Sequence, residues 1–300
     1  MADQDAIGTA AALLWPRAAE ILAAAPCPAD WAQAGLPETA YASITELAVI
    51  ALRHAMAIEA LEQGIFSERE NAAGALNMML DRAQAEGPAA WRMICLLLLL
   101  RLRQKRDVLR GMTASVRQRD PAIRVAGDQA IEAALDHLER PGPNSGQDVA
   151  DTAMRLRHVV TLLNSIVADG VGPVRARRVA DIRAKVDAAC QSQMQTGLTA
   201  QVLTPLASIT AAPMDEAAAT LCLDGIEQAA RSLRTLETTG QMLGNAAPYA
   251  ALLRNAADQI HATAAGGALE PSDQARLVEL LVGPEAGLAM LAQARGQQAA

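Results

Sequence analysis

The chain has 300 residues, of which 51% are hydrophobic, 20% charged and only 2% aromatic, and its formal net charge at pH 7 is −7. The apolar fraction is ample for a folded core, which excludes a disordered chain. The shortage of aromatic residues argues against sandwiches and barrels, because strands are built from β-branched and aromatic side chains. Alanine, the best helix former, makes up about a fifth of the sequence, so we predict an all-α protein.

Cysteine spacing and the apolar runs indicate the compartment. Cys27, Cys95, Cys190 and Cys222 form no CxxC motif, which favours reduced thiols over a disulfide framework or a zinc site. The N-terminus lacks the positive start of a signal peptide, and the longest apolar run, residues 93–100, is far shorter than the roughly 20 residues that cross a bilayer. We therefore expect a cytoplasmic protein with no membrane span. The excess of arginine over lysine, together with the alanine content, resembles the composition of proteins from GC-rich bacterial genomes.

Helix signals begin early in the chain. Ser43 followed by Glu46, and Ser67 followed by Glu70, have the spacing of a capping box and predict two helix starts. Residues 91–110 have a broad apolar middle, which predicts one central, buried helix.

The next helix carries a family resemblance. Asp120 and Pro121 open it as N-cap and first residue. Residues 120–135 resemble the second helix of a HEAT repeat, with its Asp-Pro turn and apolar-Arg pair, and a fainter echo starts at Gly172. The resemblance implies stacked helical pairs, whereas the lack of a fixed period favours ordinary bundles. We predict about eleven helices in one or two antiparallel bundles, with an irregular HEAT-like helical stack as the alternative.

A Pro/Gly-rich segment, residues 140–146, is the clearest break in the chain. It predicts an N-terminal helical region at 1–140, a linker or surface loop at 141–147 and a C-terminal helical region at 148–296. Pro205 is expected to kink or split a short helix, because proline lacks the amide N–H that a helix interior needs. The helices expected in the C-terminal region are 148–168, 173–195, 199–210, 213–240, 247–264, 271–282 and 284–295.

Charge is unevenly distributed along the chain. Residues 1–72 and 213–300 are acidic, with net charges of −7 and −5, and residues 73–212 are basic, with +5. Two basic clusters in the middle are candidate partner-binding residues. The first is Arg101, Arg103, Lys105, Arg106, Arg110, Arg117, Arg119 and Arg124, and the second is Arg175, Arg177, Arg178, Arg183 and Lys185.

These basic clusters allow two interpretations. They are either solvated helix faces or a surface for an acidic protein, nucleic-acid phosphate or an anionic lipid head group. Neither cluster contains an aromatic residue, so a nucleic acid would be held through its phosphates rather than by base stacking.

Catalytic motifs are absent from the sequence. It contains no Walker A loop, dinucleotide fingerprint, nucleophile elbow, His-Glu-x-x-His or EF-hand motif. Asp258 and His261 have the Glu-x-x-His type of spacing found in di-iron bundles, but such sites need two of these motifs. His54, with Glu59 and Glu62 one to two turns away, is expected on the inner face of its helix. We expect no metal, no cofactor and no catalytic residue. If the protein is an enzyme, the residues to mutate are His54, Glu59, Asp258 and His261.

The function best predicted by the sequence is a non-catalytic helical scaffold or adaptor. It would bind another protein, or further copies of itself, through charge-segregated helix faces. One alternative is a nucleic-acid or phosphate-binding protein that uses the basic segments 101–124 and 173–185. The other is an all-α enzyme whose site is assembled from dispersed residues.

Overall fold

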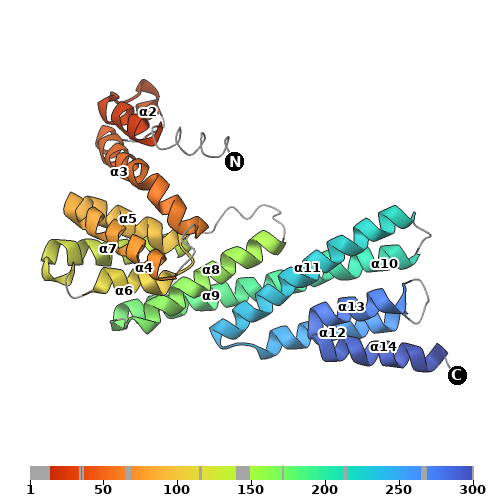
Figure 1. Cartoon of the computed structure of the whole chain (residues 1–300). Coiled ribbons are helices and arrows are strands. Elements are labelled where there is room, and N and C mark those ends of the chain that lie inside the picture. The colour runs from red at the N-terminus through yellow and green to blue at the C-terminus, as the bar shows by residue number, and fades with distance from the viewer. Residues whose placement is uncertain are drawn as a thin grey trace. The chain divides into compact units, whose positions relative to one another are not determined.

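The computed structural model describes residues 14–33, 35, 37–64, 69–114, 117–139, 149–170, 172–211, 215–264 and 269–298. Within these ranges all regular secondary structure is helical, which confirms the all-α prediction (Figure 1). Thirteen α-helices, α2 to α14, are described there, in addition to helical residues 14–24. No helix of this part of the chain is long and apolar enough to cross a membrane.

Internal contacts divide the chain into two units. Unit 1 comprises Met1–Arg140 with Ala168–Gly170, and unit 2 comprises Pro141–Val167 with Val171–Ala300. The linker predicted at 141–147 lies outside the described residues.

Unit 1 is built around one apolar helix. Its elements after residues 14–24 are α2 (Ala29–Gln33), α3 (Glu38–Gln63), α4 (Arg69–Glu86), α5 (Pro88–Arg101), α6 (Lys105–Thr113), the 3₁₀ turn η1 (Arg117–Arg119) and α7 (Pro121–Glu139). Helix α5 packs against α3, α4, α6 and α7. Trp91, Ile94 and Leu98 of α5 are buried, so α5 is the central helix of this unit.

The prediction of a single helix over 91–110 was wrong. Helix α5 ends at Arg101, Leu102 is extended, and α6 begins at Lys105. The apolar run of α5 has no continuous polar face, whereas α6 is strongly amphipathic. The break between them lets Val108 and Leu109 turn into the core while the polar side of α6 remains in water.

Unit 2 contains the remaining helices. They are α8 (Val149–Ala168), α9 (Pro173–Gly197), the π-helix η2 (Leu198–Leu203), α10 (Thr204–Ala211), α11 (Glu216–Leu243), α12 (Ala247–Ala264), α13 (Pro271–Val282) and α14 (Pro284–Gln298). The separate helices expected at 173–195 and 199–210 form one continuous helical stretch. Pro205 lacks an N–H and its ring crowds the carbonyl four residues earlier, and the wider π turn just before it accommodates this defect.

A buried polar network joins α9 to α12 in unit 2. The fully buried Tyr249 donates its hydroxyl proton to Asp187 Oδ1 at 2.7 Å. Asn245 and Gln191 donate to Asp187 Oδ2 at 2.7 and 3.1 Å. Burial and the hydrogen bond to Asp187 raise the pKa of Tyr249, so the phenol stays protonated. The carboxylate is therefore satisfied by three donors and holds the start of α12 against α9.

Candidate functional site

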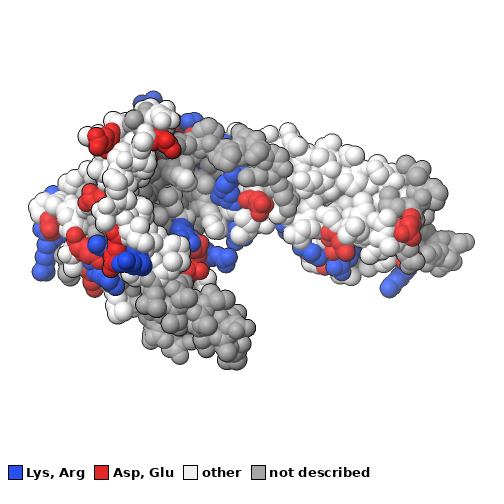
Figure 2. Space-filling model, turned by 90° about the horizontal axis from the view of Figure 1, so that it is seen from above, with Lys and Arg blue, Asp and Glu red and all other residues white. Residues whose placement is uncertain are grey.

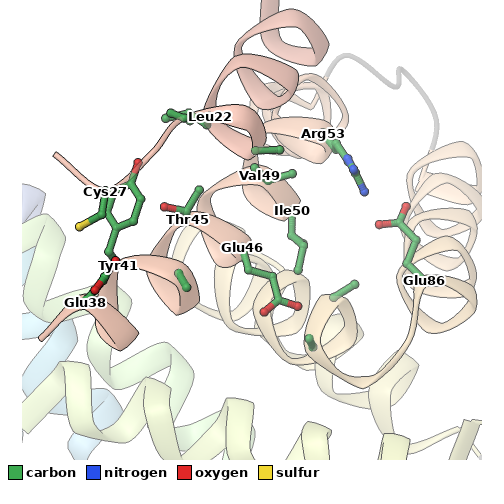
Figure 3. Close-up of a pocket in the computed structure, with 15 residues that line it drawn as sticks. Leu22, Cys27, Glu38, Tyr41, Thr45, Glu46, Val49, Ile50, Arg53 and Glu86 are labelled. Carbon is green, nitrogen blue, oxygen red and sulfur yellow. The ribbon is translucent and has the colours of Figure 1, made fainter.

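A pocket of about 670 Å³ lies in unit 1 between residues 14–24, α3 and the turn from α4 to α5 (Figure 3). Its floor is apolar because Val49 and Ile50 of α3 meet Ala90 of α5 there, and Leu22 forms part of one wall. Pockets of this size hold small ligands or a few side chains of a partner protein.

Four charged side chains surround this apolar floor. Glu38, Glu46 and Arg53 lie along α3, and Glu86 comes from the last turn of α4. In Figure 3 Arg53 and Glu86 point toward one another across the pocket. The side chains of Glu38, Glu46 and Arg53 have no ion-pair partner among the described residues. These three charges therefore remain available to a bound molecule.

Glu86 is held in place from below by a histidine. The Nε2–H of the buried His54 donates to Glu86 Oε1 at 3.2 Å, and Arg82 Nε lies 3.5 Å from the same oxygen. The burial expected for His54 is thus found, but its partner comes from α4 and not from its own helix. Of the two carboxylates expected near it, Glu59 accepts instead from Gln63 and Glu62 pairs with Arg101.

An aromatic pair forms another wall of the pocket. Trp31 Nε1 donates to the Pro37 carbonyl at 3.1 Å, which closes the turn between α2 and α3. The Trp31 ring meets the Tyr41 ring edge to face, with centroids 5.1 Å apart, and Tyr41 lines the pocket. Tyr41 is therefore supported from behind and offers the pocket a fixed aromatic surface.

The thiol in this pocket is poorly suited to catalysis. Partial burial and the Glu38 carboxylate raise the pKa of Cys27, which disfavours the reactive thiolate. His54 is committed to Glu86, so Cys27 has no described histidine beside it to act as a base. Nor do any three His, Cys, Asp or Glu side chains of the described residues come together as metal ligands would.

Two members of the first predicted basic cluster are buried. Lys105 and Arg117 are interior residues, with only 2% and 6% of their surface exposed. Arg117 donates to the Gly111 carbonyl at 2.9 Å and to Asp81 at 2.6 Å, and its role is to tie α4 to α6. Arg101 is paired with Glu62. Arg101 is nevertheless exposed, as are Arg103, Arg106, Arg110, Arg119 and Arg124.

The second predicted cluster lies in the other unit. Arg177 and Lys185 are exposed, whereas Arg175 and Arg178 are half-buried. Arg183 bonds to Asn164 of α8 and donates to the Leu243 carbonyl at the end of α11, so it holds helices together. Over the parts of each unit visible in Figure 2, acidic and basic side chains lie next to one another.

The four residues named as candidates for an enzyme are divided between the two units. His54 and Glu59 are in unit 1, and Asp258 and His261 line a smaller groove in unit 2. No protein-family model, curated protein or solved structure is detectably similar to the chain.

The pocket residues were not identified from the sequence. Two signals were present in the sequence. The first was the acidic excess of residues 1–72, and the second was the spacing of about two helical turns between Glu38, Glu46 and Arg53 on the face of the helix that also carries Val49. The contribution of Glu86 had no sequence signal, because it depends on how α4 packs beside α3.

Proposed function

We propose that the protein is a non-catalytic adaptor that holds a basic, partly apolar segment of another protein in the pocket of unit 1. The observation that carries this proposal is the pairing of an apolar floor with two exposed carboxylates, Glu38 and Glu46, that have no partner among the described residues.

A lysine or arginine side chain matches this chemistry. Its hydrocarbon stem would lie along Val49 and Ile50 while its charged end reaches the carboxylate of Glu46. Glu38 lies about two turns earlier on α3 and would take a second basic side chain of the same segment. The face of Tyr41 adds a cation–π contact of about 0.5–1 kcal/mol for an exposed site. The exposed carboxylates contribute more to selecting a basic partner, and to the rate of encounter, than to the affinity itself.

The structure supports the two alternatives less well. Phosphate binding would rely on basic clusters from which Lys105, Arg117 and Arg183 are withdrawn by burial or by internal bonds. Catalysis by the named residues would need His54, whose surface is only 2% exposed. Because several arginines of unit 1 are exposed, the test below also measures binding of nucleic acid.

The test measures fluorescence anisotropy of two labelled helical peptides on the full-length protein. One peptide is made of Leu and Arg, and in the other every Arg is replaced by Glu. We expect saturable binding of the basic peptide alone, weakened by added salt. Glu38→Gln combined with Glu46→Gln should weaken binding about three- to tenfold, as expected for two exposed ion pairs.

Matched variants separate the pocket from the rest of α3. Glu59→Gln removes an exposed carboxylate of the same helix outside the pocket and should leave binding unchanged. Ala42→Trp fills the pocket and should abolish binding of the basic peptide. Equal binding of both peptides, or unchanged binding by Ala42→Trp, would refute the proposal. A mobility shift of random RNA or DNA that survives Ala42→Trp would favour the nucleic-acid alternative instead.

A further inference from the structure

A second groove, in unit 2, has chemistry that the adaptor function does not use. It has a volume of about 260 Å³ and lies where α12, α13 and α14 pack together (Figure 1). Arg254, Asp258 and His261 line it from α12, and their spacing of four and three residues places them on one helix face.

The opposite wall of the groove is apolar. It is formed by Val278 and Val282 of α13 and by Ala286, Ala289 and Met290 of α14. The groove exists because α14 carries small residues here. At the neighbouring Gly287, a Cβ atom would meet the Ala275 carbonyl oxygen at 2.8 Å, so glycine permits the close approach of α13 and α14.

The charged groups of the groove are not used by the fold. Asp258 and His261 have no hydrogen-bond or ion-pair partner among the described residues. Arg254 donates its Nε–H to the Ala250 carbonyl at 3.2 Å, which leaves the two terminal nitrogens of its guanidinium available. Arg254 and Asp258 are one turn apart, yet no ion pair closes between them.

We propose that this groove binds a small zwitterion with an aliphatic body, such as an α-amino acid with a branched side chain. The guanidinium of Arg254 would take the carboxylate through two parallel hydrogen bonds. The Asp258 carboxylate would take the ammonium group, and the aliphatic side chain would lie against Val278 and Met290. His261 and Gln293 supply further hydrogen-bonding groups at the rim.

Size and charge both favour this class of ligand. Pockets for drug-sized molecules start at about 300 Å³, so this groove suits something smaller. A simple anion would be repelled by the carboxylate of Asp258, and a simple cation would be repelled by the guanidinium of Arg254. A metal ion would find only Asp258 and His261, and no cluster of three such ligands occurs among the described residues. This inference does not depend on the function proposed for unit 1.

The test uses isothermal titration calorimetry on the full-length protein with L-leucine. 4-Methylpentanoate and isopentylamine, which are leucine without its ammonium group and without its carboxylate, serve as comparison ligands. We expect saturable binding of leucine, and binding about tenfold weaker for each comparison ligand, because each lacks the charged group that would meet Asp258 or Arg254. A lack of saturable heat with L-leucine, L-valine and L-methionine would overturn the proposal, as would equal binding of leucine and 4-methylpentanoate.

Variants locate the binding site. Asp258→Asn and Arg254→Gln should each weaken leucine binding about tenfold, and Ala289→Leu, which fills the groove from an exposed position, should abolish it. Arg231→Gln on α11 removes an exposed guanidinium outside the groove and should change nothing. Far-UV circular dichroism confirms that each variant is folded. Unchanged leucine binding by Ala289→Leu would place the ligand elsewhere and refute the assignment.

Discussion

Replacing Gly240 by alanine tests how tightly α11 packs against α12. Gly240 is buried in α11, and a Cβ atom added to it would lie 2.4 Å from Cε2, 2.5 Å from Cδ2 and 2.8 Å from Cζ of Tyr249. All three atoms belong to one rigid ring, so no flexible side-chain end can move aside. The ring would have to shift by about 1 Å to reach ordinary van der Waals contact.

The Tyr249 hydroxyl limits that shift. It donates to Asp187 Oδ1 at 2.7 Å, and a displacement of about 1 Å breaks this bond. Overpacking costs about 1–3 kcal/mol, and loss of a hydrogen bond to a carboxylate about 1.5–3 kcal/mol. Alanine recovers about 0.5–1 kcal/mol of helix propensity. We therefore expect Gly240→Ala to lower the free energy of unfolding by about 2–5 kcal/mol.

Gly225 provides the matched control on the same helix. An added Cβ there meets nothing within 4 Å, so Gly225→Ala should stabilise the protein by about 0.5–1 kcal/mol. The assay is urea unfolding of the full-length protein followed by far-UV circular dichroism. Trp15, Trp31 and Trp91, the only tryptophans, are all in unit 1, so tryptophan fluorescence reports on that unit alone. Equal stability of the two variants would refute the packing argument.

Further variants test three interior polar groups, Lys105, Tyr249 and Arg117. Burial lowers the pKa of Lys105 from 10.5 to about 8, so between these values the unfolded chain binds a proton that the folded chain does not, and stability rises with pH. Lys105→Met should therefore raise the free energy of unfolding by about 1–3 kcal/mol at pH 7 and by less near pH 10. Urea titrations at the two pH values measure this, and an equal gain at both would contradict the expectation. Tyr249→Phe should cost about 1.5–3 kcal/mol because Asp187 loses a donor, and a change below about 0.5 kcal/mol on chemical unfolding would show that this bond is dispensable. Arg117→Met should lower the melting temperature, at a cost of about 1–3 kcal/mol, whereas Asp81→Asn, at the exposed end of the same pair, should cost less than about 1 kcal/mol. If calorimetry shows equal losses for Arg117→Met and Asp81→Asn, the stabilisation comes from the ion pair itself and not from the hydrogen bonds of the buried guanidinium.

Local features of the sequence determined the helical class and several elements of the fold. The stripe of α3 that contains Ile50 and Ile58, the burial of α5 and the start of α7 at Pro121 all depend on residues within a few turns of one another. Helix propensity, capping and amphipathic spacing act over that range, so these features are readable without tertiary information.

Tertiary packing decided which charges are structural and where a site can form. Lys105 and Arg117 read as members of a basic surface, yet the break before α6 and the packing of α4 bury both. His54 meets Glu86, which is 32 residues away, and that contact places a carboxylate at the pocket of unit 1. Burial and long-range contact depend on how helices pack against one another, and composition and periodicity carry no information about which distant side chains will meet.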